Sequence, residues 1–518
     1  MSTNYFENAK KTKTKLESIS PTMCMAKWLQ VSMHLPQGLT QSCYHPPTHK
    51  IPLSELAITP KALHNTHEKV RQRKQMCEGK RPEGCQYCWN IEDAPNGPHL
   101  SDRHYRSSEW WVKDAWDEVV EGGWDENINP RYVEVNFNQA CNFKCTYCSP
   151  HLSTEWEKEI NQFGPYDIGD QKHNDIPSLR SAGLMPIQVS QADNPYIQAF
   201  WDWWPDLYKD LKVFRMTGGE PLMDKNTFKV LDYVNINPNS TLDLSITSNM
   251  CPPDQSLFEK FINKLKKIET VRVWEDKEKY NPDSGNHWYV SPACKHFSLF
   301  VSVDSVGEQA EYIRTGLNFD IMLNNVRTVL SETHGTEVTF INTFNLLSIP
   351  KLKDYLQMIL DLRIEFGYEN QVEQFEVVTD DSRTHPPFVR KKRQRVGFDI
   401  PYLREPNWMS AQNAAFYPKL IETLENCIQF MEDNKEKDDY DKTFHGFRPH
   451  EIAKLKRDVA WIKNGKKDIS SQEIANRRKT FLKYFEQIDE RRNVNFTKTF
   501  PQLSEWYNDC IKETGNNK

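Results

Sequence analysis

The sequence predicts an α/β protein in which a parallel sheet of six strands lies between a small cysteine-rich segment and a helical region. Two observations support this fold class. Short β-branched and aromatic segments alternate with helical patterns through the middle of the chain, as expected for βαβ units wound right-handed. The last 130 or so residues carry apolar stripes at helical spacing instead. We expect the boundaries at 1–20, 21–125, 126–384 and 385–518.

The six expected strands share a composition rich in Val, Ile, Phe and Tyr. Patterns of apolar residues at helical spacing lie between them, at 257–267, 321–332 and 352–366. Two connections, 150–211 and 268–296, are long enough to suggest lids or insertions. The strands are expected at 132–138, 213–216, 242–247, 297–304, 338–344 and 375–378.

The flanking regions differ from the middle in composition. Residues 1–20 are polar and rich in lysine, and we expect a mobile tail there. Residues 21–125 predict a hairpin around Pro36-Gln37-Gly38, followed by a polar helix over 54–76. Residues 385–518 predict helices, one of which begins with a capping box formed by Ser470 and Glu473.

Composition excludes several classes of protein. The 518 residues include 66 Lys and Arg against 72 Asp and Glu, a net charge of -6 that does not suggest a general nucleic-acid binder. The longest apolar stretch, near 297–303, is far shorter than the ~20 residues that cross a bilayer. The first residues lack the apolar core of a secretory signal, so we expect a cytoplasmic protein without a membrane partner.

Twelve cysteines in such a chain predict metal rather than disulfides. The strongest pattern is NQACNFKCTYCSP, in which Cys141, Cys145 and Cys148 follow an expected strand with CxxxCxxC spacing. Three thiolates on one short loop can hold three irons of a [4Fe-4S] cluster and leave the fourth iron open to a small molecule. A zinc site or incidental thiols would fit this spacing alone.

A second motif, TGGEPL, ends the second expected strand. Gly218 and Gly219 allow a close backbone approach to a ligand, and Glu220 supplies an acceptor for a ligand ammonium group. A plain strand-to-helix turn would explain the glycines but not their pairing with a cysteine loop.

Together these motifs resemble those of the radical S-adenosylmethionine (radical SAM) enzymes, over roughly residues 130–380. The resemblance implies a partial (β/α)6 barrel with both motifs at the carboxyl ends of strands, where barrel active sites lie. It implies that the three cysteines bind the cluster and that Tyr147 fills the aromatic position before the last of them. It also implies that Gly218, Gly219 and Glu220 hold the methionine amino group of S-adenosylmethionine.

Two weaker matches belong to the same resemblance. Ser248 and Asn249, after the third strand, resemble the segment that contacts the ribose. Ser302, Asp304 and Arg314 resemble the SxD…R segment that reaches the ribose or carboxylate of the cofactor. Helix capping, or solvation of a turn, is the alternative for these five residues.

The cysteines of the N-terminal region form another pattern. Cys24 and Cys43 with Gly38 between them, followed by Cys85 and Cys88, resemble the twitch domain, a shortened SPASM domain. The resemblance implies a hairpin-plus-helix domain that binds an auxiliary [4Fe-4S] cluster, although in many relatives this domain follows the barrel. Cys77 is a competing ligand, and a four-cysteine zinc ribbon fits the same spacing.

The implied reaction is reductive cleavage of S-adenosylmethionine, after which a 5′-deoxyadenosyl radical abstracts hydrogen from a substrate. It implies an electron donor such as flavodoxin or ferredoxin. Twitch and SPASM relatives often modify peptides, so a peptide or protein side chain is the first expectation. An aminosugar or nucleotide derivative is the second. A non-catalytic iron–sulfur electron-transfer protein is the third, although it would have no need for the GGE residues.

Overall fold

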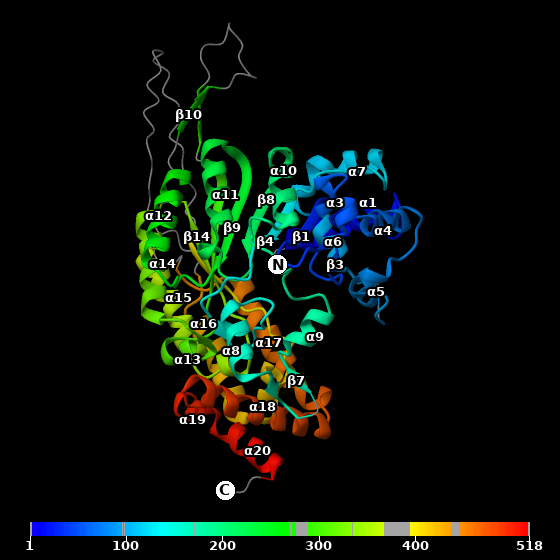
Figure 1. Ribbon diagram of the computed structural model, residues 1–518. Coiled ribbons are helices and arrows are strands. Elements are labelled where there is room, and N and C mark those ends of the chain that lie inside the picture. The colour runs from blue at the N-terminus through cyan, green and yellow to red at the C-terminus, as the bar shows by residue number, and fades with distance from the viewer. Residues whose placement is uncertain are drawn as a thin grey trace.

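A nine-stranded sheet forms the centre of the molecule (Figure 1). The computed structural model describes residues 3–95, 97, 99–169, 171–269, 272–275, 288–291, 293–333, 335–366, 394–436 and 445–515. The strand order is β15-β14-β12-β9-β8-β4-β1-β2-β3. Six neighbouring strands are parallel: β4 (Tyr132–Asn136), β8 (Val213–Thr217), β9 (Asn239–Ser248), β12 (Cys294–Ser302), β14 (Glu337–Ile341) and β15 (Val396–Asp399).

Helices connect these strands in chain order, as the sequence predicted. The three helices expected from periodicity are present, two with slightly wider bounds and the third, at Leu352–Phe366, with the expected ones. The sixth strand differs: the expected segment 375–378 lies outside the described residues, and β15 follows it instead. The connecting helices are α10 (Pro195–Asp210), α11 (Lys225–Ile236), α12 (Gln255–Glu269), α13 (Gly307–Ile313), α14 (Phe319–Glu332) and α15 (Leu352–Phe366).

The two faces of the sheet differ in polarity. Val133, Phe214 and Leu244, on adjacent strands, belong to the main apolar core. The alternating positions are polar, because successive side chains of a strand point to opposite faces. One row of polar residues in register crosses six strands: Ser32, Glu134, Arg215, Ser245, Ser298 and Glu337.

The expected N-terminal hairpin is present and continues the same sheet. β1 (Gln30–His34) pairs antiparallel with β2 (Leu39–Gln41), which pairs with β3 (His49–Lys50). β1 also pairs parallel with β4. The predicted helix over 54–76 is interrupted, because a 3-10 turn at Pro60–Leu63 separates two helices. The helices of this region are α2 (Ala26–Leu29), α3 (Leu53–Leu56), α4 (His67–Cys77), α5 (Gln86–Glu92), α6 (Asp102–Ser107) and α7 (Trp116–Gly122).

The prediction of a mobile tail over residues 1–20 is wrong. Residues Thr3–Glu17 form the helix α1, which packs against α6. Ala9 and Leu16 are fully buried, and Tyr5 stacks on Tyr105 with ring centroids 5.3 Å apart. The many lysines of this segment occupy the other positions of the helix, which is why composition alone suggested a tail.

The two long connections contain secondary structure. The first includes α8 (Thr154–Phe163), β6 (Tyr166–Asp167), β7 (Lys172–His173) and α9 (Ile176–Ser181) before α10. The second includes the antiparallel pair β10 (Arg272–Glu275) and β11 (Trp288–Ser291), which extends away from the sheet in Figure 1.

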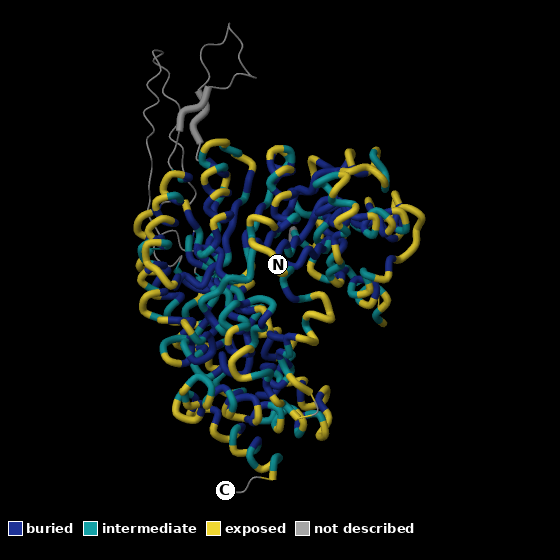
Figure 2. Tube along the Cα trace, viewed as in Figure 1, coloured by how far each residue is buried: buried dark blue, intermediate teal, exposed yellow. Residues whose placement is uncertain are grey.

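The C-terminal region is helical from α16 (Pro418–Asp433) onward, as predicted, whereas β15 shows that residues 396–399 of the expected helical region belong to the sheet. The buried residues of the C-terminal region (Figure 2) belong to the same apolar core as those of the sheet. Ser470 caps α18 by accepting a hydrogen bond from the Glu473 amide. Within the described residues, no helix is both long enough and apolar enough to cross a membrane. The helices are α16 (Pro418–Asp433), α17 (Pro449–Asp468), α18 (Ser471–Arg492), α19 (Phe496–Thr499) and α20 (Ser504–Thr514).

A buried ion pair joins the sheet region to the C-terminal helices. Arg363 of α15 donates to Glu451 of α17 at 2.7 Å and to the Val396 carbonyl of β15 at 3.0 Å. The Arg363 and Glu451 side chains are 0% and 6% exposed. Because removal of one partner leaves a buried charge unpaired, we expect Arg363→Met to lower the free energy of unfolding by about 3–5 kcal/mol.

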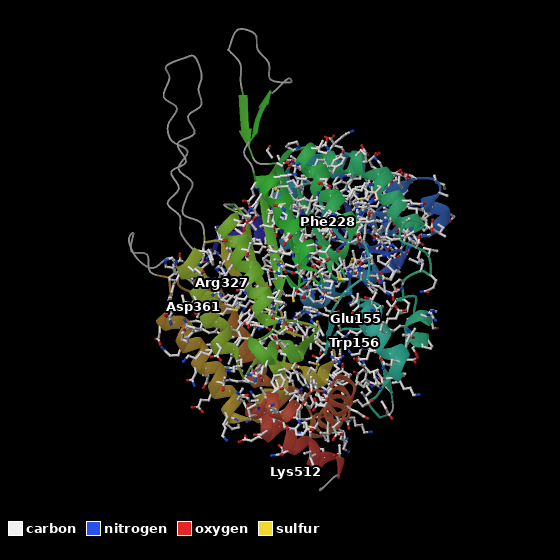
Figure 3. All side chains as sticks on the ribbon, turned by 60° about the vertical axis from the view of Figure 1, so that its left-hand side comes forward. Glu155, Trp156, Phe228, Arg327, Asp361 and Lys512 are labelled. Carbon is white, nitrogen blue, oxygen red and sulfur yellow. The ribbon has the colours of Figure 1, made fainter. Side chains whose placement is uncertain are left out.

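Denaturant unfolding followed by tryptophan fluorescence measures this loss. Arg327→Met is the matched control, because Arg327, labelled in Figure 3, pairs with Glu365 at the surface. We expect this variant to lose only about 0–1 kcal/mol. Equal losses in the two variants would contradict a special role for the buried pair.

Candidate active site

The three cysteines of the CxxxCxxC motif lie on one loop after β4. Cys145 is buried, and Cys141 and Cys148 are half-buried. Burial and, after it, the neighbouring Cys145 thiolate raise the pKa of the Cys148 thiol to about 12. Burial also raises the pKa of the Cys141 thiol, and the thiolates of Cys145 and Cys148 contribute to that rise. The three thiols lie within eight positions of one loop and are near enough to act on one another electrostatically.

Side chains from two helices hold this loop in place. The indole nitrogen of Trp156, a residue labelled in Figure 3, donates to the Cys145 carbonyl at 2.8 Å. The hydroxyl of Tyr484 on α18 donates to the Thr146 carbonyl at 2.5 Å. The C-terminal helical region therefore helps to fix the cysteine loop, a role that no pattern in the sequence indicated.

The diglycine turn after β8 packs directly against the residues that precede Cys141. The Glu220 amide donates to the Ala140 carbonyl at 2.7 Å. A Cβ atom on Gly219 would lie 2.3 Å from that carbonyl oxygen, and Gly218 has a φ of +125°. The two glycines thus permit close approach between the two motifs, whereas the sequence suggested only an approach to a ligand.

Glu220, Ser248 and Asn249 form one buried group. The carboxylate of Glu220 accepts from the Ser248 hydroxyl at 2.8 Å and from the Asn249 amide at 2.7 Å. Burial raises the pKa of Glu220 to about 7, and the hydrogen bonds from backbone amides oppose that rise. The Asn249 side chain donates to Asn142 of the cysteine loop at 2.9 Å. Asn142 is a site residue that the sequence analysis missed.

Asp304, Arg314 and Tyr147 form a second buried group behind the cysteines. Arg314 donates to Asp304 at 2.8 and 3.1 Å, and the Tyr147 hydroxyl donates to the same carboxylate at 2.7 Å. Arg314 also lies 3.6 Å from the Cys145 sulfur. Its strand β13 (Arg314–Thr315) pairs with β5 (Lys144–Cys145). These residues contact each other and a cysteine, and Ser302 lies nearby, at the end of β12.

The donor set at this loop consists of three thiols, the ligand type that iron–sulfur clusters take. All twelve cysteines are free. Among the residues that the structure describes, no three His, Cys, Asp or Glu side chains are grouped closely enough to hold a metal ion as they stand. The guanidinium beside Cys145 favours the thiolate form that metal binding needs.

The N-terminal cysteines line a second site. Cys24, Cys43, Cys85 and Cys88 all line one cavity, together with Lys27, His45, Trp89, Asp102, Arg103 and Arg106 among others. Burial and, after it, the thiolates of Cys43, Cys88 and Cys85 raise the pKa of Cys24 to about 12. Cys77 is exposed at the end of α4 and does not line this cavity.

Known proteins resemble parts of this chain. No family model matches it. A GTP 3′,8-cyclase of Desulforamulus reducens is 25% identical over 158 residues, which are 30% of this chain and 37% of that protein. One of Campylobacter lari is 24% identical over 118 residues, 23% and 27% of the two chains. The chain thus aligns with about a third of the length of these relatives.

Solved structures also match parts of this chain. The crystal structure of Streptococcus suis SuiB bound to precursor peptide SuiA has 13% sequence identity and a TM-score of 0.25. The match covers 65% of this chain and 60% of SuiB.

The cysteine loop and the diglycine turn lie in contact at the carboxyl ends of adjacent parallel strands. Together with the similarity to the two GTP 3′,8-cyclases over part of the chain, this arrangement supports the resemblance to radical SAM enzymes.

Proposed function

We propose that Cys141, Cys145 and Cys148 bind a [4Fe-4S] cluster and that S-adenosylmethionine binds beside it for reductive cleavage. The contact between the cysteine loop and the Gly218–Glu220 turn carries this proposal. When bound, the cluster supplies the electron that breaks the carbon–sulfur bond of the sulfonium. The electron comes from a donor such as flavodoxin or ferredoxin.

The protein's own residues position the cofactor. In this proposal Glu220 accepts hydrogen bonds from the methionine ammonium group, at a position already held by Ser248 and Asn249. Asp304, Arg314 and Tyr147 hold the cysteine loop, and Ser302 and Asn249 face the ribose. The proposal includes closure of the six parallel strands into a partial (β/α)6 barrel around this site.

We further propose that the N-terminal region, residues 21–125, is a twitch-like domain with an auxiliary [4Fe-4S] cluster. Its ligands are Cys24, Cys43, Cys85 and Cys88, which line a common cavity. The exposed position of Cys77 argues against its serving as the competing ligand.

The proposed substrate is a peptide or protein side chain, in line with the resemblance to twitch and SPASM enzymes. A nucleotide is the second candidate, because the curated relatives are named for a reaction of GTP. Anaerobic incubation of the active enzyme with candidate peptides and with GTP, followed by mass spectrometry, distinguishes the two.

The first prediction concerns metal content. Anaerobically reconstituted protein should carry about eight irons, since each of two clusters holds four. Cys85→Ala should lower the value to about four, and Cys77→Ala should leave it unchanged. About four irons with bound zinc in the unaltered protein would refute the auxiliary cluster.

The second prediction separates the two cysteine sites by their products. Cys145→Ala should reduce the release of 5′-deoxyadenosine to background, because the cluster loses a ligand. Cys85→Ala should retain part of that release while product formation from the substrate stops. Liquid chromatography of the reduced reaction measures both. Full release from Cys145→Ala would refute the assignment.

The third prediction tests the contact between the motifs. Gly219→Ala places a methyl group 2.3 Å from the Ala140 oxygen, and such overpacking costs typically about 1–3 kcal/mol. We expect the cysteine loop to shift and the iron content to fall from about eight to about four, although no ligand changes. Gly335→Ala is the control, since the nearest atom is a flexible Glu269 oxygen at 3.6 Å.

A further inference from the structure

Three cationic side chains are buried together in the N-terminal region. Lys27 is 2% exposed, and Lys69 and Arg73 are 0% exposed. Lysine and arginine are almost never fully buried unless an anion pairs with them. Lys27 lies on α2, and the other two lie one turn apart on α4.

The two lysines contact only neutral groups. The Lys27 ammonium donates to the Gln72 side-chain carbonyl at 2.7 Å. The Lys69 ammonium donates to the Thr40 hydroxyl at 3.1 Å. The carboxylate of Glu68 is reached only indirectly, through the Gln72 amide.

Arg73 likewise contacts only neutral groups. It donates to the Lys27 carbonyl at 3.2 Å and to the imidazole of His64 at 3.0 Å. Its Nη1 atom has no hydrogen-bond partner. Within the described part of the chain, none of the three cations has a carboxylate oxygen within 4.0 Å. The structure thus buries three cations and supplies no protein anion to compensate them.

The cysteine cavity lies beside these cations. Lys27 lines it together with the four cysteines. Arg73 donates to the Lys27 carbonyl, and Met76, one turn further along α4, lines the cavity as well. The carboxylate of Asp102 in this cavity is bonded to His45. The four thiols are therefore acidic groups close to these cations that no carboxylate-bound cation compensates.

The other cations of the cavity do not explain this arrangement. Arg103 pairs with Glu92 at 2.7 Å, with both side chains largely buried. Arg106 lies over the ring of Tyr44. The uncompensated positive charge comes from Lys27, Lys69 and Arg73.

We propose that Lys27, Lys69 and Arg73 are the counter-charge of the four-cysteine iron–sulfur centre and raise its reduction potential. This inference rests on the proposed auxiliary cluster. Four thiolates give such a centre a net negative charge, and one-electron reduction adds a further unit. Because buried charges interact strongly, nearby cations stabilise the reduced form more than the oxidised form. The centre is thereby poised to accept an electron.

A redox titration of the full chain tests the proposal. Cys141, Cys145 and Cys148 are replaced by alanine, so that only the N-terminal centre remains. Dithionite and mediators supply the electron, and electron paramagnetic resonance follows the reduced centre. We expect Lys69→Met and Arg73→Met each to lower the equilibrium constant for reduction about tenfold, which is about 59 mV for a one-electron couple.

Two controls separate charge from packing. Arg71→Met changes an exposed cation on the same helix, already paired with Glu68, and should leave the potential unchanged. Lys69→Arg keeps the charge and should retain most of the unaltered potential. If the methionine variants lose their iron, Lys69→Gln and Arg73→Gln replace them. Loss of iron in all neutral variants but not in Lys69→Arg would also support the counter-charge.

The outcomes distinguish this inference from the proposed function. An iron–sulfur centre whose potential is the same in all variants would overturn the counter-charge and leave the auxiliary cluster standing. Loss of the centre in Lys69→Arg as well would indicate a packing role and overturn it too. Zinc in place of iron would refute the auxiliary cluster itself, and with it the inference.

Discussion

The close contact between the turn after β8 and the loop after β4 is the constraint on which the site depends. Two adjacent parallel strands end at the same edge, and their loops compete for the same space. Only a residue without a side chain fits at Gly219, since the Ala140 oxygen occupies the position of a Cβ atom. The hydrogen bond from Glu220 to Ala140 then fixes the carboxylate relative to the cysteines. The glycines are therefore required for the contact between the two loops, whether or not a ligand is bound.

The sequence was informative where a local pattern determines the structure. Five of the six parallel strands and three of the helices between them followed from β-branched segments and apolar periodicity, and Ser470 caps α18. Composition misled at residues 1–20, where two buried residues, Ala9 and Leu16, outweigh many lysines. The last strand was also not found, because β15 has only four residues and pairs at the edge of the sheet.

Contacts between distant segments could not be predicted. The Tyr484 hydroxyl donates to the Thr146 carbonyl, 338 positions away in the sequence. A periodic pattern of apolar residues cannot predict such a contact. The motif residues Asp304 and Arg314 were found by resemblance, but their buried ion pair beside Cys145 was not. The four N-terminal cysteines were grouped by resemblance to the twitch domain, and the structure adds that they line a common cavity.

The two cysteine sites differ in how their surroundings balance charge. Beside Cys145, the cation Arg314 is neutralised by Asp304, so the protein adds little net charge to that loop. Beside Cys43, three buried cations have no carboxylate partner. A centre in a neutral environment is harder to reduce than one among cations, because the added electron is less well compensated. The proposed counter-charge would therefore place the potential of the N-terminal centre above that of the first centre, so that an electron would pass toward the N-terminal centre.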